Sequence, residues 1–135
     1  MSWQEFEELV KGVFDSHDFH TKFRVVFKDE RGKSEIDVVA QKFGLVIAID
    51  AKKYSEWWHR SSALKRQAEK HLERCERYSQ FTGEEVIPII VSFIDDQIFD
   101  HWGCIVVPME KLNDFLLNFY AYLDDLGYSG SKAKD

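Results

Sequence analysis

The sequence has little that would predict a membrane-spanning or secreted protein. No apolar run in it approaches the roughly 20 residues that a membrane-spanning helix needs. Residues 1–5 contain neither the basic nor the apolar region of a secretory signal. We therefore expect a cytoplasmic protein without a membrane partner.

Cysteine is scarce, and neither cysteine nor histidine shows a metal-binding spacing. Cys75 and Cys104 fit no metal-binding or redox motif, which predicts reduced and partly buried thiols. The sequence also lacks a glycine-rich phosphate loop and the residue order of a serine hydrolase. No metal is assigned to any of the five histidines, which are His17, His20, His59, His71 and His101.

The length and composition fit one folded domain. With 135 residues, of which 44% are hydrophobic, the chain is long enough to bury a core without disulfide bonds. No repeat or low-complexity linker divides it. We predict a single domain over residues 1–127 and a disordered tail over residues 128–135.

Hydrophobic periodicity predicts an α/β fold with the element order α-β-β-β-α-β-β-α. A long helix separates the third strand from the fourth, so a right-handed crossover makes these two strands parallel within a mixed sheet. The expected elements are a helix over residues 2–14, strands over 23–27, 34–40 and 45–52, a helix from Ser61 or Ser62 to Tyr78, strands over 86–94 and 104–107, and a helix over 109–126, with a polar connection over 95–102.

Two neighbouring strands carry charged residues inside otherwise apolar runs. Asp37 lies in the strand at 34–40, and Asp50 and Lys52 lie in the strand at 45–52. Because only a short link joins these two strands, we expect them to form a hairpin. Strand alternation places Asp50 and Lys52 on one face. If the register sets Asp37 beside Asp50, two carboxylates and one ammonium converge at one end of the sheet.

This cluster has two interpretations. Buried charges are costly unless they are paired or coordinate a metal. Asp50 and Lys52 therefore form either part of a metal site or a simple ion pair at a strand end. Alternation along the other strand puts Asp37 on the same face as two neighbours, Glu35 and Val39, and puts Ile36, Val38 and Ala40 on the opposite face.

Charge is distributed unevenly along the chain. The net charge is −6, yet residues 52–77 carry +4 and the rest carries −10. A basic segment of this kind can face the phosphates of a nucleic acid while the acidic surface keeps the protein soluble. A solvated helix with ordinary surface ion pairs is the alternative.

The spacing of Asp37 and Asp50-Ala51-Lys52, together with the element order, resembles the PD-(D/E)xK nuclease superfamily. Within it the chain looks most like the Mrr-type restriction endonucleases and the archaeal Holliday junction resolvases. The matching stretches are residues 5–10, 35–40 and 49–54, within a resemblance that covers residues 3–95. The chain departs from the family pattern at Ile36, which replaces proline, and at Asp50, where these branches more often have glutamate.

The resemblance implies a restriction-endonuclease-like three-layer domain with a mixed sheet, an αβββαβ core, and a further strand and C-terminal helix. It also implies a DNA endonuclease that uses Mg²⁺, with Mn²⁺ as a substitute, in restriction, repair or junction resolution. Asp37, Asp50 and the carbonyl of Ala51 would bind the metal, and Lys52 would orient the attacking water. The alternative is an inactive nuclease-fold protein that binds nucleic acid or a protein partner.

Three glutamates on the first helix compete for an auxiliary acidic position. Glu8 almost opposes the apolar stripe, whereas Glu7 lies nearer its edge than Glu5. Glu7 therefore best reaches inward and is the fourth catalytic candidate. The alternative is an ordinary solvated glutamate.

Residues after the central strands are candidates for contacts with DNA. Gln67 resembles a glutamine that many such nucleases place after the catalytic lysine. Trp57 and Trp58 either stack on unpaired bases or form buried or dimer contacts. We expect a homodimer, with the aromatic side chains of the last helix supplying the contact. The nucleic-acid-binding candidates are Lys53, Tyr54, Arg60, Lys65, Arg66, Gln67 and Lys70.

Overall fold

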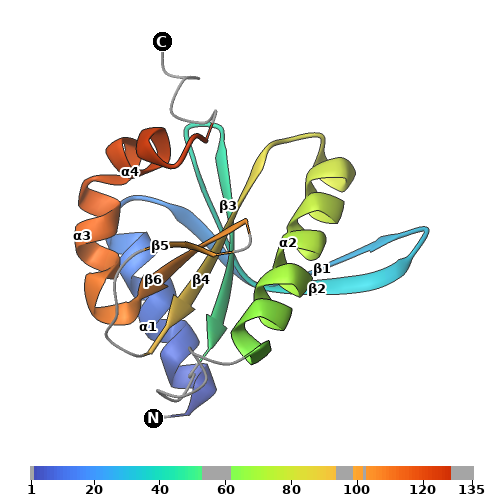
Figure 1. The fold of residues 1–135 in the computed structure, drawn as a ribbon, viewed down its shortest axis with the longest axis horizontal. Coiled ribbons are helices and arrows are strands. Elements are labelled where there is room, and N and C mark those ends of the chain that lie inside the picture. The colour runs from blue at the N-terminus through green and yellow to red at the C-terminus, as the bar shows by residue number, and fades with distance from the viewer. Residues whose placement is uncertain (1, 53–61, 94–98, 102, 129–135) are drawn as a thin grey trace.

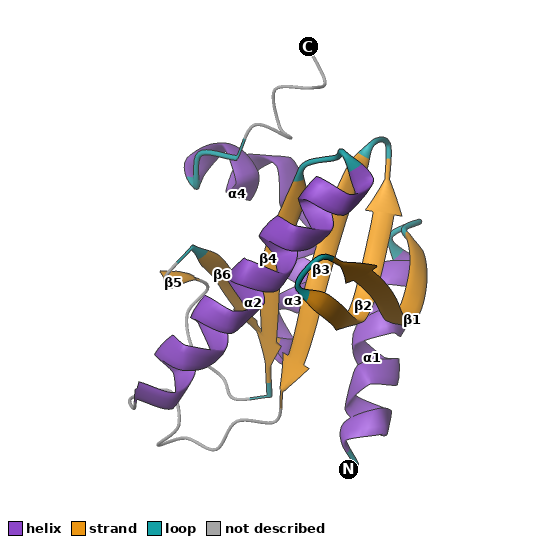
Figure 2. Cartoon of the chain, turned by 90° about the vertical axis from the view of Figure 1, so that its right-hand side faces the viewer, coloured by secondary structure: helices purple, strands orange, loops and turns teal. Residues whose placement is uncertain are grey.

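A mixed β-sheet separates helix α2 from the other helices (Figures 1 and 2). The computed structural model describes residues 2–52, 62–93, 99–101 and 103–128, and in this part of the chain the sheet has six strands in the order β1-β2-β3-β4-β6-β5. The elements are α1 (Trp3–Ser16), β1 (His20–Asp29), β2 (Gly32–Lys42), β3 (Leu45–Lys52), α2 (Ser62–Thr82), β4 (Val86–Ser92), β5 (Phe99–His101), β6 (Cys104–Pro108), the 3-10 helix η2 (Met109–Lys111), α3 (Leu112–Leu117) and α4 (Phe119–Asp125).

The predicted α/β class and the central topology are confirmed. β1, β2 and β3 form an antiparallel meander, and β3 pairs in parallel with β4 after the α2 crossover. One face of the sheet packs against α1, α3 and α4, and the opposite face packs against α2. The result is the three-layer arrangement that the sequence predicts.

Helix α1 begins directly after Ser2, which caps it. The Ser2 hydroxyl accepts a hydrogen bond from the Glu5 backbone N–H at 3.1 Å, and the Glu5 carboxylate accepts one from the Ser2 N–H at 3.0 Å. This capping box satisfies two donors that a helix start leaves open. Phe6, Val10 and Phe14 then repeat at helical spacing and are fully buried.

The carboxyl-terminal part differs from the prediction in three places. The expected polar connection contains β5, which pairs with β6 at the edge of the sheet. The expected last helix is divided at Asn118, whose side-chain amide donates to the Asp114 carbonyl at 3.0 Å and so competes with regular helix geometry. Tyr128 belongs to the predicted tail, yet its hydroxyl donates to the Gly103 carbonyl at 3.2 Å.

The β1–β2 ribbon bends at Arg24 and Asp37. Ile36 packs in the cluster under α2 together with Val39, whereas Val38 packs in the cluster under α1. The predicted face assignment, with Ile36 and Val38 on one side, is therefore wrong. The cause is a change in the pleat at the ribbon position where Arg24 adopts φ +47°, which turns the outer half of the ribbon toward α2.

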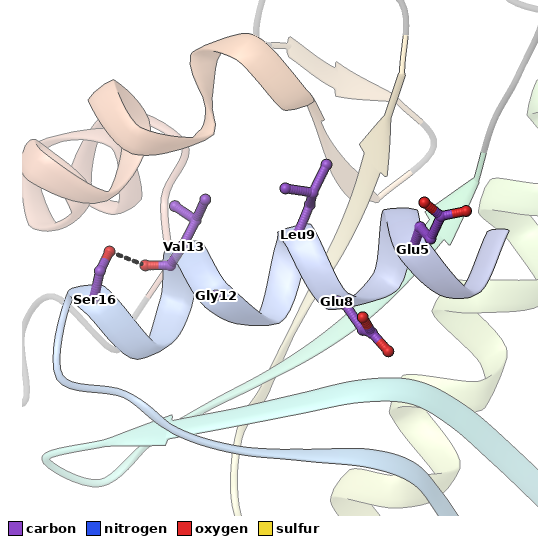
Figure 3. Close-up of a pocket in the computed structure, with 6 residues that line it drawn as sticks. All are labelled: Glu5, Glu8, Leu9, Gly12, Val13 and Ser16. Atoms are coloured by element: carbon purple, nitrogen blue, oxygen red, sulfur yellow. Dashed lines mark hydrogen bonds between the residues drawn. The ribbon is translucent and has the colours of Figure 1, made fainter. Parts of the chain in front are cut away.

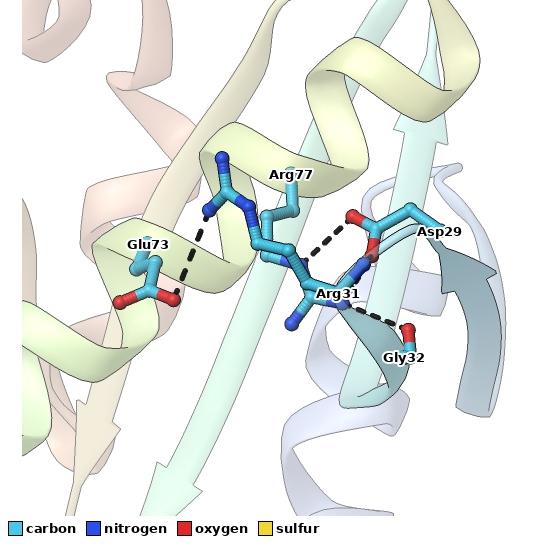
Figure 4. A network of polar contacts seen from close by, with 5 residues as sticks. All are labelled: Asp29, Arg31, Gly32, Glu73 and Arg77. Carbon is cyan, nitrogen blue, oxygen red and sulfur yellow. Dashed lines mark hydrogen bonds and ion pairs between the residues drawn. The ribbon is translucent and has the colours of Figure 1, made fainter.

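The outer end of this ribbon is tied to α2 by an arginine (Figure 4). Arg77 donates from Nη2 to Asp29 Oδ1 at 2.6 Å and from Nε to Asp29 Oδ2 at 2.9 Å. Its Nη2 also donates to the Gly32 carbonyl at 2.9 Å. A planar guanidinium suits this bidentate geometry. The hydrogen bond from Arg77 lowers the pKa of Asp29 to about 2.

We predict that Arg77→Met loosens the ribbon tip, because Asp29 and Gly32 then lose their shared donor. Hydrogen exchange of the backbone amides at residues 29–34 should become faster, and Asp29→Asn should reproduce part of the effect. Since the pKa of Asp29 is lowered, this protection is complete above pH 4 and is lost as the pH falls toward 2. Arg31→Met is the matched control, because Arg31 lies 4.0 Å from Glu73 in an exposed pair. Equal exchange rates in Arg77→Met and the wild-type protein would contradict the prediction.

The β2–β3 connection is a two-residue turn with an exposed aromatic residue. Phe43 and Gly44 have φ values of +50° and +80° between the paired residues Lys42 and Leu45, which is the pattern of a type I′ turn. The first position of this turn favours Asn, Asp or Gly. Phe43 is nevertheless there, with 74% of its surface exposed.

We predict that Phe43→Asn raises the free energy of unfolding by about 1 kcal/mol, because Asn tolerates the left-handed conformation. Urea denaturation followed by circular dichroism measures this change. Phe43→Ala is the matched control, since it removes the ring and keeps a side chain that disfavours positive φ. An equal gain in both variants would mean that removal of the ring, rather than relief of strain, is responsible.

Candidate active site

Asp37 lies where β2 and β3 separate. The β2–β3 ladder runs from Lys42 and Leu45 to Val38 and Ile49, and one further step along the same register sets Asp37 beside Asp50. Here the side chain of Asp37, instead of a backbone carbonyl of β2, accepts a hydrogen bond from β3. Its Oδ2 accepts a hydrogen bond from the Ala51 N–H at 3.2 Å. The carboxylate of Asp37 therefore contacts the peptide unit that joins Asp50 to Ala51.

Asp50 is buried in β3. Only 1% of its surface is exposed. Alternation along β3 places Asp50 on the face of Val46 and Ala48, which is the face that packs against α2. A carboxylate at this depth is costly without compensating interactions.

Lys52 is the last residue of β3, and its backbone pairs with Ser92 of β4. The side chain of Lys52 lies outside what the structure describes. Lys53, Tyr54 and Arg60, together with Trp57 and Trp58, also lie outside the described residues. Their predicted roles stay predictions.

Glu7 reaches inward from α1, as the helical geometry predicts. It is 3% exposed, whereas Glu5 and Glu8 are exposed. Its Oε1 accepts a hydrogen bond from Arg24 Nη2 at 2.9 Å. Because Arg24 sits opposite Asp37 in the β1–β2 ladder, this ion pair joins α1 to the acidic end of the sheet.

The remaining candidates lie on α2. Lys65, Arg66 and Lys70 are exposed, and Gln67 is half-buried. Figure 2 shows that α2 begins at the end of the sheet where β3 ends and where α1 starts. The structure thus brings the first turns of α2 to the same end of the molecule as Asp50.

His71 of α2 is fully buried, and the sequence analysis assigned it no role. Its Nε2 lies 2.9 Å from the carbonyl oxygen of Ala48, so Nε2 carries the proton and donates. Burial lowers the pKa of His71 to about 4. The neutral imidazole therefore connects α2 to β3, two residues before Asp50.

Arg24 is the second residue that sequence reasoning missed. A polar residue between Phe23 and Val25 looks like the solvent face of a strand, and the ion pair with Glu7 depends on a backbone bend that no sequence motif marks. The inward position predicted for Glu7 could have indicated a partner such as Arg24, because a buried carboxylate needs a cation or hydrogen-bond donors.

The described part of the chain shows neither a ready-made metal cluster nor a membrane-spanning helix. Within it, no group of three or more His, Cys, Asp or Glu side chains is arranged to hold a metal ion. No helix there is long and apolar enough to cross a membrane. A groove of about 530 Å³ runs along α1 beside Leu9 and Val13, and it is lined by neither Asp37 nor Asp50 (Figure 3).

Comparisons with known proteins bear on the family and the fold. A family model described as restriction endonuclease, for the Mrr catalytic domain, matches residues 1–68. An uncharacterized protein of Archaeoglobus fulgidus is 54% identical over 128 residues, which cover 95% of this chain and 99% of that protein.

Two crystal structures share the fold. The small subunit of the heterodimeric restriction endonuclease R.BspD6I aligns with a TM-score of 0.55 at 13% identity, over 84% of this chain and 67% of that chain. A protein of unknown function aligns with a TM-score of 0.53 at 22% identity, over 67% of this chain and 45% of that chain. The chain therefore spans less than half of the second protein. At these identities the similarity shows the fold and nothing further.

We predict that His71 makes the fold sensitive to mild acid. The unfolded chain binds a proton at His71 near pH 6.5 and the folded chain only near pH 4, so stability is complete above pH 6.5 and falls as the pH approaches 4. The loss is on the order of 3 kcal/mol. Urea denaturation at pH 7 and pH 4 measures this loss. Between these two pH values, the free energy of unfolding should fall more in the wild-type protein than in His71→Gln, and the difference should equal the loss.

His17→Gln is the matched control, because His17 is a half-buried imidazole that contacts the Asn113 side chain. If His71→Gln and His17→Gln kept the full pH dependence of the wild-type protein, His71 would not be its source.

Proposed function

Since the chain belongs to the restriction endonuclease family of the Mrr catalytic type, we propose that it is a metal-dependent DNA endonuclease centred on Asp37, Asp50 and Lys52. The family match covers residues 1–68, and these include all three residues. The observation that carries the proposal is the hydrogen bond from the Ala51 N–H to Asp37, which brings the Asp37 carboxylate to the Asp50–Ala51 peptide unit.

The available oxygen atoms fit a hard divalent cation. Asp37 and Asp50 supply carboxylates, and the carbonyl of Ala51 is a neutral oxygen ligand on the adjoining peptide unit. Mg²⁺ prefers such oxygen ligands and keeps several waters, so two carboxylates and one carbonyl are a sufficient protein contribution. Bound there, Mg²⁺ or Mn²⁺ would polarise the scissile phosphate and activate a water.

The protein's own residues would position the reactants. Asp37 is oriented by the Ala51 N–H, and this orientation is present before any ligand binds. Lys52 follows Asp50 by two residues and would orient or help to deprotonate the attacking water and offset charge in the transition state. Glu7, held by Arg24, would assist as the third acidic residue at this end of the sheet.

Several finer features belong to the same proposal. Lys65, Arg66 and Lys70 at the start of α2 would contact the DNA backbone, with Gln67 beside them and Lys53, Tyr54 and Arg60 in the preceding segment. These contacts would depend on salt and not on sequence. A homodimer would pair two sites for cleavage of both strands or of a junction.

A second candidate function is nucleic-acid or partner binding without catalysis. It is favoured by the acidic net charge of −6 and by aspartate at position 50. The two proposals differ in whether the protein binds a metal ion at Asp37 and Asp50. Calorimetric Mn²⁺ titration of the full chain should show binding that is lost in Asp37→Asn and Asp50→Asn under the nuclease proposal, and no such binding under the alternative.

We predict that the protein cleaves DNA with Mg²⁺ or Mn²⁺ and that Asp50→Asn lowers the cleavage rate by at least about a hundredfold. The assay uses labelled duplex, single-stranded, flap and four-way-junction DNA. Asp50→Asn keeps the side-chain volume, and circular dichroism checks that the variant folds.

Glu35→Gln is the matched control, since Glu35 is an exposed acid on β2 two residues before Asp37. Its cleavage rate should equal that of the wild-type protein. Lys52→Ala should lose cleavage together with Asp50→Asn. DNA binding without cleavage of any substrate, unchanged in all variants, would favour the binding function.

A further inference from the structure

Arg24 has an unusual backbone conformation beside the acidic residues. Its φ is +47°, a left-handed value that residues other than glycine rarely adopt. The residues on each side of it are paired across the ladder, Phe23 with Val38 and Val25 with Ile36, so Arg24 sits opposite Asp37. Strained positions of this kind cluster at functional sites, which makes Arg24 a candidate for a role of its own.

The contacts of Arg24 hold its guanidinium in place and leave much of it accessible. Nη2 donates to Glu7 Oε1 at 2.9 Å, and the guanidinium carbon lies 5.1 Å from the ring centroid of Trp3. The side chain is still 42% exposed. An arginine has five N–H donors in a fixed fork, which is more than the bond to Glu7 uses. Arg24 can therefore bind a second acidic group while it stays on Glu7.

The charges around Arg24 indicate what this second group is. Glu7, Asp37 and Asp50 place three carboxylates at one end of the sheet, and each of them repels an approaching phosphate. Arg24 supplies a permanent positive charge at the same place. Its planar fork matches the geometry of a phosphate as well as that of a carboxylate.

We infer that Arg24 contacts a backbone phosphate of the DNA at the active site while its Nη2 remains bonded to Glu7. The inference rests on the proposed nuclease function and adds a phosphate-binding residue from β1, outside the basic segment at residues 52–77. Arg24 then has two roles, since it neutralises Glu7 and offsets the repulsion between the acidic site and its polyanionic substrate.

The test measures DNA binding in EDTA, where no cleavage takes place. Fluorescence anisotropy gives the Kd over a series of NaCl concentrations, for the DNA form that the wild-type protein binds most tightly. Every variant carries Glu7→Gln, so that loss of Arg24 does not remove a cation from beside a buried carboxylate at position 7. The comparison is between Glu7→Gln and Glu7→Gln/Arg24→Gln.

The matched control is Glu7→Gln/Lys22→Gln. Lys22 is an exposed cation of the same strand, two residues before Arg24, and its ladder partner Val39 belongs to the cluster under α2. It lies before the bend and controls for the general effect of one lost positive charge. Circular dichroism and thermal melting confirm that both double variants fold.

We expect Arg24→Gln to weaken binding about tenfold, as for one lost charge-assisted contact. It should also reduce the slope of log K against log [NaCl] by about 0.9, the value for one phosphate on duplex DNA. Lys22→Gln should change both quantities much less. Equal effects of Arg24→Gln and Lys22→Gln, or no effect of Arg24→Gln, would overturn the inference and leave the nuclease proposal intact. Absence of DNA binding by the wild-type protein would overturn both.

Discussion

The arrangement of the acidic residues depends on the hydrogen bond between the Asp37 carboxylate and the Ala51 N–H. At this point β2 turns away from β3, so a strand N–H of β3 would otherwise lose its ladder partner. The carboxylate replaces the missing backbone acceptor, and this satisfies a buried donor that is costly to leave open. The same bond fixes Asp37 beside Asp50, so a requirement of the sheet and a requirement of the proposed chemistry are met by one side chain.

Much of the fold could be predicted from the sequence, because its signals are local. The apolar repeat of α1, the short link between β2 and β3, and the long helix before β4 each correspond to one element, and together they determine the central topology. The inward position of Glu7 also followed from helical geometry alone. These features depend on residues a few positions apart, where periodicity is informative.

The features that escaped prediction depend on contacts between distant residues. β5 is a three-residue edge strand whose pairing with β6 no periodicity could show. The sequence did not reveal the role of His71 because its acceptor, Ala48, is 23 residues away in the chain. The role of Arg24 required both the bend in β1 and the position of Glu7 on α1. Secondary-structure propensity does not predict features that are determined by tertiary packing.

The position of the acidic residues along the chain has a consequence for how the protein is made. Glu7, Arg24, Asp37 and Asp50 all precede α2, whereas β4, the parallel neighbour of β3, follows it. Ribosomes synthesise a chain from its amino terminus, so the segment of α1 and the meander emerges before α2 and β4. During synthesis this segment exposes the apolar face that α2 later covers. The acidic end of the sheet is thus assembled from residues that are synthesised before α2 and β4, and its burial requires those later elements.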